Sequence, residues 1–249
     1  MGSYSITSGR EISAFFDREA ATYEKVLVGN AGVQYVNNVE KNIFKGWTRR
    51  FEGRKALDVG VGTGRFGKIL AQSGFRVTGV DRSLEMIKGV KGESGKNWVK
   101  LIVGDGQRLP LKSNSVDNIS CMRVFKYFEN ANNALGEFYR VLVHRGYGII
   151  QVANRISYQY LLTVFKSVGN RTYNSHLCLH SYGEMIRLFR ENGFTVKDSA
   201  ITIRIPFFIY AKLKGQVGLK ALGKLEKVMD RIFPEHFMAR DYLFLVQKM

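Results

Sequence analysis

The sequence predicts an α/β protein built on a doubly wound, seven-stranded, mainly parallel sheet with helical cap insertions. Short apolar runs alternate with segments of helical periodicity, which is typical of βαβ units. A glycine-rich turn follows the first apolar run. The 249 residues, 45% of them hydrophobic, suffice for the core of one domain. Because parallel strands are joined by right-handed crossovers, these features favour helices on both faces of the sheet.

The elements are expected in the following order. Apolar residues recur at roughly helical spacing over residues 11–50, so residues 1–50 are predicted to form an N-terminal helical cap. The apolar run at 56–59 ends in glycines and predicts a buried parallel strand. Further strands are expected at 76–80, 99–103, 116–122, 147–152, 195–203 and 242–247. Helices are expected at 66–72, 84–90, 131–143 and 182–192.

Two connections interrupt this alternation, at residues 155–180 and 204–240. Each exceeds the roughly 12–15 residues of an ordinary loop, so each is predicted to have structure or a function of its own, as a lid over the substrate. In the second, apolar residues recur at helical spacing from Val217 to Ile232, with basic residues mostly on another face. That pattern predicts an amphipathic helix.

Composition limits the classes of protein. Two cysteines, Cys121 and Cys178, exclude a disulfide scaffold and are too few for a structural zinc site without histidines, so no metal centre is expected. We find no signal peptide and no run of about 20 apolar residues. A cytoplasmic protein, with peripheral membrane contact as a further possibility, is therefore expected.

The formal net charge of +17 is concentrated in three places. Residues 41–55 and 203–229 each contain six basic residues and one acid, and residues 155–180 contain three basic residues and no acid. In the two insertions the basic residues are interleaved with large apolar ones, which favours an anionic membrane surface or a lipid-like substrate. A lid over a small molecule and a nucleic-acid surface are the alternatives. The oligomeric state is not indicated.

The glycine-rich turn is the clearest ligand-binding signal. Such a turn between a strand and a helix lets a ligand approach the backbone and the free N–H groups of the helix. Gly62, Gly64 and Gly67 satisfy the dinucleotide fingerprint, and Asp81 follows about 20 residues later, where an acid would bind a ribose. At this point a nicotinamide or flavin enzyme is one interpretation.

Further motifs favour another family. Asp58 precedes the glycines as D-x-G-x-G-x-G, Gly104-Asp105-Gly106 follows the third strand, and Arg140-Val141-Leu142 with Gly146 precedes the fifth. Together these residues resemble the class I S-adenosylmethionine-dependent methyltransferases, particularly the methyltransferase-11-like group, over roughly residues 50–155. The resemblance implies a Rossmann-like methyltransferase fold and S-adenosylmethionine as the cofactor. It does not identify a substrate.

The resemblance also implies cofactor-binding residues. The loop under the methionine and ribose would be formed by Gly60, Gly62 and Gly64. Asp58 would orient this loop and accept a hydrogen bond from the cofactor's amino group, directly or through water. Capping of the turn is the alternative for Asp58.

Other residues are implied for the rest of the cofactor. Asp81 would accept both ribose hydroxyls, for which a carboxylate has enough acceptor sites, and Arg82 and Met86 would flank the adenine. Asp105 would accept from the adenine amino group, and the Gly106 N–H would donate to a ring nitrogen. Helix capping for Asp81, with Ser83 as competitor, and an ordinary turn for Asp105 are the alternatives. The methionine end would be bordered by the segment Ser120-Cys121-Met122-Arg123, in particular by Cys121 and Met122.

The sequence departs from the family where many members carry a histidine with an acidic neighbour, since Tyr127 and Lys126 stand there instead. A base is needed only if the nucleophile must lose a proton. Tyr127 and Asn154 are the candidate catalytic residues, with His176 and His180 less favoured. The expected activity is in-line methyl transfer to a small-molecule or lipid-like acceptor. A tRNA or rRNA methyltransferase, a nicotinamide-dependent oxidoreductase and a non-catalytic binding protein are the alternatives.

Overall fold

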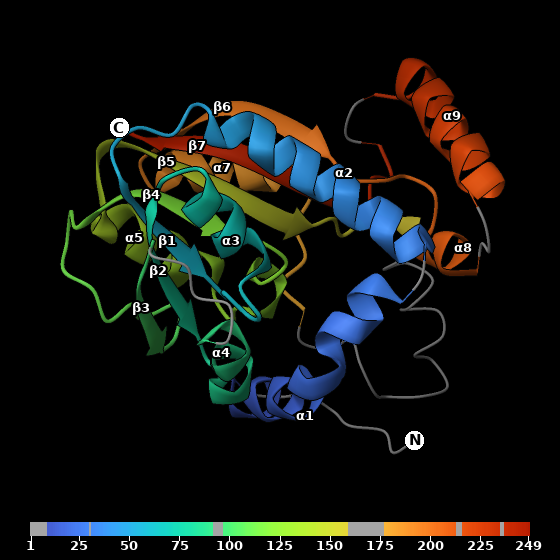
Figure 1. The fold of residues 1–249 in the computed structure, drawn as a ribbon. Helices are drawn as coiled ribbons and strands as arrows, with labels where there is room; N and C mark the ends of the chain where they lie inside the picture. Colours follow the sequence, from blue (N-terminus) through green and yellow to red (C-terminus); the bar gives the residue numbers. More distant parts are fainter. Residues whose placement is uncertain (1–8, 30, 92–96, 159–176, 213–215, 235–236) are drawn as a thin grey trace.

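The computed structural model describes residues 9–29, 31–91, 97–158, 177–212, 216–234 and 237–249. They form a seven-stranded sheet in the order β3-β2-β1-β4-β5-β7-β6 (Figure 1). All neighbouring strands are parallel except β7, which runs antiparallel to β5 and β6. The strands are β1 (Lys55–Val59), β2 (Arg76–Asp81), β3 (Trp98–Val103), β4 (Val116–Cys121), β5 (Leu142–Ala153), β6 (Phe194–Ile201) and β7 (Asp241–Lys248). The predicted mainly parallel, doubly wound sheet is thereby confirmed.

Helices pack on both faces of the sheet because successive strand residues point to opposite faces. Leu57 and Val59 of β1 belong to the core cluster that contains residues of α5 (Ala131–Val141) and α7 (Tyr182–Glu191). Ala56 belongs to the cluster on the other face, with residues of α2 (Ala31–Thr48) and α3 (Arg65–Gln72). The α4 helix (Leu84–Lys91) packs beside β2 and β3, and α1 (Gly9–Val28) packs against α4 and α2.

Some predicted boundaries were wrong, most clearly that between α5 and β5. The helix expected at 131–143 ends at Val141, and β5 begins at Leu142 rather than at residue 147. The pairing of β5 with β4 shifts between Leu142 and Tyr147, and Arg145 within this stretch has a left-handed backbone (φ +61°). A strand irregularity of this kind breaks the two-residue periodicity on which the prediction depended.

The second insertion contains α8 (Phe207–Lys212) and α9 (Gln216–Ile232), which confirms the predicted amphipathic helix. Figure 1 shows α9 standing away from the sheet. Its buried Glu226 accepts hydrogen bonds from the backbone N–H groups of Arg204 and Ile205 and from the hydroxyl of Tyr210, at 2.8–3.0 Å. These contacts fix which face of α9 points outward. Most of the first insertion, residues 159–176, lies outside the described residues.

Candidate functional site

A cavity of about 330 Å³ lies at the carboxyl ends of β1, β2 and β4. This is where open α/β sheets bind ligands. The loops after these strands supply one side of the cavity, and α1 covers the other. Seven residues of α1 line it: Ile12, Ser13, Phe15, Phe16, Glu19, Tyr23 and Val26.

The predicted glycine loop lies at this cavity. Gly60, Gly62 and Gly64 all have left-handed backbones, with φ of +68°, +53° and +87°. A Cβ atom on Gly60 would lie 2.2 Å from the Val124 side chain, so no larger residue fits. A Cβ on Gly62 would meet no atom closer than 4.0 Å, whereas Gly64 is not on the cavity wall and forms the N-cap of α3.

Asp81 lies at the end of β2 and lines the cavity. One carboxylate oxygen accepts from the Gly62 N–H at 2.8 Å, and the other accepts from the Ser83 N–H at 2.9 Å. Burial raises the pKa of Asp81 above its ordinary value of 3.8, although these backbone hydrogen bonds oppose the change. The Ser83 hydroxyl accepts from the Met86 N–H at 3.1 Å, so Ser83 caps α4. Each oxygen of Asp81 still has acceptor capacity toward the cavity.

Asp58 and Cys121 lie beneath the cavity and not on its wall. An oxygen of Asp58 accepts from the Ser120 hydroxyl at 2.6 Å. Burial raises the pKa of Asp58 to about 7, although hydrogen bonds from Ser120 and the Gly67 backbone oppose this. Asp58 therefore holds the loop from below, and the cofactor contact predicted for it, directly or through water, stays a prediction. Cys121 is a core residue, and the adjacent Met122 lines the cavity.

Three of the four residues predicted to contact the adenine lie on the cavity wall. Arg82, Met86 and Gly106 line the cavity, but Asp105 does not. Asp105 forms an ion pair with Arg82 at 2.5 Å, and its other oxygen accepts from the Gln107 N–H at 2.9 Å. One oxygen of Asp105 thus makes the contact of an ordinary turn residue, whereas the other pairs with Arg82.

Comparison with known proteins identifies the family. A family profile described as a methyltransferase domain matches residues 57–150. An uncharacterised protein of Methanocaldococcus jannaschii is 31% identical over 183 residues, which cover 72% of this chain and 80% of that protein. The malonyl-[acyl-carrier protein] O-methyltransferase of Methylococcus capsulatus is 27% identical over 194 residues, 76% of this chain and 68% of that one.

A demethylmenaquinone methyltransferase of Renibacterium salmoninarum is 25% identical over 196 residues, which cover 71% of this chain and 76% of that enzyme. The chain belongs to the class I S-adenosylmethionine-dependent methyltransferases. The magnesium protoporphyrin IX methyltransferase of Synechocystis, crystallised with S-adenosylhomocysteine, has the same fold, with a TM-score of 0.67 and 15% identity over 97% of this chain and 100% of that one. The nicotinamide interpretation of the glycine loop is therefore replaced.

S-adenosylmethionine is the cofactor of this methyltransferase, and the cavity fits it. The volume is in the range of small-molecule sites. The Asp81 carboxylate faces the cavity with the acceptor sites that a ribose diol requires. Because residue 62 is a glycine, the space beside its backbone is open; any side chain at this position would occupy it. Asp81, the glycine loop and Met86 are thus the residues that would hold the cofactor.

The catalytic candidates occupy different places in the methyltransferase. Tyr127 lines the cavity, in a short 3-10 helix (Phe125–Tyr127) after β4. Asn154 is fully buried outside it, where its amide donates to the Ala239 carbonyl at 2.7 Å and accepts from the Ile156 N–H at 3.1 Å. Its position is that of a structural residue.

The two histidines give no alternative base in the described part of the chain. His180 is absent from the cavity wall and contacts the Cys178 sulfur at 3.0 Å. Burial lowers the pKa of His180. His176 lies outside the described residues. Among the described residues, no three potential metal ligands come together.

The contacts by which α1 closes over the cavity are not indicated by the sequence. The Ser13 hydroxyl donates to the Arg82 carbonyl at 2.9 Å. Asp17 accepts from the Ser83 hydroxyl at 2.5 Å and from the Glu85 N–H at 3.2 Å. These polar residues lie on an amphipathic helix whose periodicity does not reveal their partners, so the cap was predicted without its contacts.

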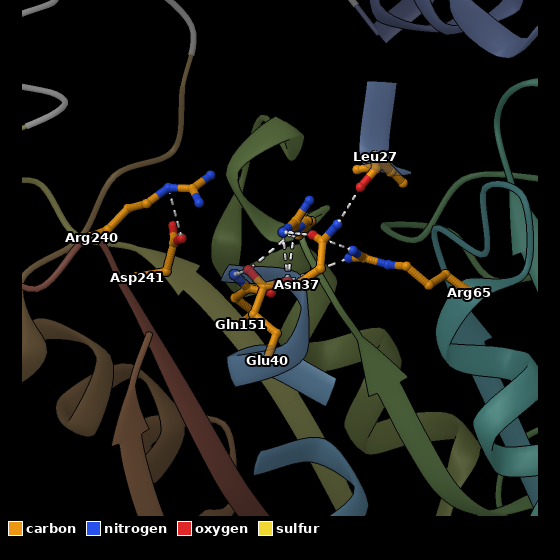
Figure 2. Close-up of polar contacts among 8 residues, drawn as sticks. Leu27, Asn37, Glu40, Arg65, Gln151, Arg240 and Asp241 are labelled. Atoms are coloured by element: carbon orange, nitrogen blue, oxygen red, sulfur yellow. Dashed lines mark hydrogen bonds and ion pairs between the residues drawn. The ribbon is translucent and has the colours of Figure 1, made fainter. Parts of the chain in front are cut away.

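A buried network of charged and polar residues was also missed (Figure 2). Glu40 of α2 is fully buried, and its carboxylate accepts from Arg123 at 2.8 and 3.1 Å, from Gln151 at 3.1 Å and from Arg65 at 3.4 Å. Asn37 accepts from Arg65 at 2.8 Å and from Arg123 at 2.7 Å. Burial alone would raise the pKa of Glu40, but the surrounding arginines lower it overall. The network fixes Arg123 at the cavity wall.

Proposed function

We propose that this enzyme transfers the methyl group of S-adenosylmethionine to a small, lipid-like acceptor. The observation that carries the proposal is the aromatic wall of the cavity. Phe16 and Tyr23 of α1 line it together with Tyr127 and Phe128, and the rings of Phe16 and Tyr127 meet edge to face with centroids 5.4 Å apart. Such a surface suits an apolar or aromatic acceptor body.

Two relatives are named for acceptors other than nucleic acids, namely malonyl-[acyl-carrier protein] and demethylmenaquinone. These names support an acyl or quinone-like acceptor for the present enzyme. An RNA substrate is the competing proposal, since the chain is strongly basic.

The contribution of the protein to the reaction is alignment. When bound, the cofactor supplies a methyl group on a positively charged sulfur. The cavity walls hold the acceptor in line with that methyl group and exclude water. Tyr127 is the side chain placed to accept a proton, if the acceptor atom carries one.

The first experiment identifies the acceptor class. Purified enzyme and methyl-labelled S-adenosylmethionine are added to a cell extract, and the label is followed into lipid, small-molecule, protein and RNA fractions. We expect label in the lipid or small-molecule fraction, and none above background with the Asp81→Ala variant. Label confined to RNA contradicts the proposal.

The exposed surface of α9 supports a site of action at an anionic membrane. Leu225, Val228 and Ile232 recur at helical spacing and are 48%, 47% and 67% exposed. A stripe of exposed cations lies beside them on the same helix: Lys220, Lys224, Lys227 and Arg231. Phe233 and Phe237, whose ring centroids lie 5.2 Å apart in a stacked pair, are exposed next to this stripe.

Apolar and basic residues side by side favour the headgroup region of an anionic bilayer. None of the described helices is long and apolar enough to cross a bilayer.

Charge reversal on α9 tests the membrane proposal. Each basic residue near an anionic bilayer contributes about 1 kcal/mol, so Lys220→Glu with Lys224→Glu and Lys227→Glu is expected to weaken vesicle binding about 100-fold or more. Binding is measured by co-sedimentation with vesicles of phosphatidylglycerol and phosphatidylcholine. The matched control carries Lys100→Glu, Lys112→Glu and Lys197→Glu, three exposed lysines elsewhere, and has the same net charge. Equal loss in both triple variants, or tighter binding of wild type to tRNA than to vesicles, contradicts the proposal.

A further inference from the structure

A small polar recess adjoins the main cavity at the carboxyl ends of β4 and β5 and the start of β7. It holds about 10 Å³, room for one oxygen-sized group. Its lining consists of Arg123, Lys126, Gln151, Ala153, Arg240 and Asp241. Arg123, Lys126 and Arg240 also line the main cavity. Three cations therefore surround the junction of the two spaces.

Arg123 is held at this junction by Glu40 and Asn37. Its Nε and one terminal nitrogen are bound by Glu40 and Asn37. Its backbone is left-handed, with φ of +63°, which is uncommon for a residue with a side chain. A conformation that costs energy and is maintained by several buried hydrogen bonds indicates a side chain whose position matters.

The other two cations complete the cluster. The Nε of Arg240 lies 3.3 Å from an Asp241 carboxylate oxygen, and Figure 2 shows the guanidinium directed from the start of β7 toward the centre of the network. Lys126 is half-buried, with its ammonium 5.1 Å from the centre of the Tyr127 ring. In the described part of the chain, no carboxylate lies within 4.0 Å of that ammonium.

Acids near the junction pair with two of its three cations, Arg123 and Arg240. Asp241 is in the recess, and Glu40 lies beneath it with its oxygens taken up by donors from Arg123, Arg65 and Gln151. Glu19 contributes a carboxylate to the main cavity from α1. Clustered, largely desolvated cations are favourable when an anion binds among them.

We propose that the junction of Arg123, Lys126 and Arg240 binds an oxyanion of the acceptor, a carboxylate or a phosphate, while the aromatic wall holds its apolar body. This inference rests on the proposed function and defines the acceptor further, as an anionic amphiphile. The methionine carboxylate of the cofactor has the same chemistry, so the test is made with the cofactor site already filled.

Calorimetry of the enzyme saturated with S-adenosylhomocysteine tests the inference. The probes are octanoate and octyl phosphate, with octanol and octylamine as apolar bodies of equal length without the anion. We expect an anionic probe to bind at least 10-fold more tightly than octanol or octylamine. Lys126→Gln and Arg240→Gln are each expected to weaken that binding about 10-fold and to change S-adenosylhomocysteine affinity less than threefold. Octanoate and octyl phosphate distinguish the two oxyanions, and tighter binding of either supports the site.

Arg187→Gln is the matched control, because it removes an exposed arginine of α7 that is absent from both cavities. Lys126→Gln keeps the inference testable if Arg240→Gln unfolds, since the Arg240 side chain is only 12% exposed and pairs with the buried Asp241. Equal affinity for octanol and octanoate overturns the inference, as does loss of S-adenosylhomocysteine binding in the variants with anion binding unchanged. Failure of wild type to bind S-adenosylhomocysteine is a separate result, which would count against the proposed function itself.

Discussion

Replacing Asp81 by asparagine is expected to weaken S-adenosylmethionine binding about 100-fold. Asp81 is the carboxylate on the cavity wall beside the glycine loop, with acceptor capacity left on both oxygens. A hydrogen bond to a charged group contributes about 1.5–3 kcal/mol, and two to a ribose diol together account for the expected change of about 3 kcal/mol. Asparagine has nearly the same shape but retains one acceptor oxygen, so the change removes charge and acceptor sites from an otherwise similar cavity.

The measurement is titration calorimetry with S-adenosylmethionine for wild type and Asp81→Asn. Glu85→Gln is the control, since Glu85 is an exposed acid at the start of α4 and is not on the cavity wall. Thermal unfolding without cofactor separates a lost ligand contact from a disturbed loop, because Asp81 also accepts from the Gly62 backbone. A variant that binds the cofactor as tightly as wild type would show that the ribose site is elsewhere.

Replacing Glu40 by alanine is expected to lower the free energy of unfolding by about 3–5 kcal/mol. Removal of one partner from a buried ion pair leaves the other charge uncompensated, and Glu40 is the partner of both Arg123 and Arg65. For a protein of this size, 1 kcal/mol corresponds to roughly 2–4 °C, so the melting temperature should fall by about 10 °C. Glu52→Ala, an exposed acid near the start of β1, is the control and should change it little.

The effect of Glu40 should also depend on pH. Since the folded state lowers the pKa of Glu40 below its ordinary 4.5, the carboxylate stabilises the fold above that value. This stability is lost as the pH falls through the lower pKa of the folded protein. Unfolding in urea at pH 7 and at pH 3 should therefore show a large difference between wild type and Glu40→Ala at pH 7 and a smaller one at pH 3. The same difference at both pH values would argue against an ionised Glu40.

The sequence was sufficient to predict the parts of the site that are local in the chain. The glycine loop and Asp81 each lie at the end of an apolar strand, and parallel strands bring their carboxyl ends to one edge of the sheet. For that reason Gly60, Gly62 and Asp81 could be assigned to one ligand from the order of residues alone. Asp58 belongs to the same motif, but its side chain alternates to the interior beneath the loop, which a motif does not show.

The substrate side of the site could not be predicted in the same way. The Glu40 network joins residues 40, 65, 123 and 151, which come from two helices, the loop after β4 and strand β5. None of them lies within a motif that implies the others, and a buried glutamate in a helix looks like a solvated one until the packing is known. The aromatic wall depends equally on how α1 docks, which no local pattern specifies.

The docking of α1 has a consequence for how the enzyme exchanges its ligands. Seven residues of the cavity wall belong to this one helix, whose polar side chains reach across to Arg82, Ser83 and Glu85. Whatever fills the cavity therefore stabilises the docked helix, and the docked helix retains whatever fills the cavity. Cavity occupancy and the docking of α1 are therefore thermodynamically coupled, and we expect α1 to undock more readily once the spent cofactor leaves.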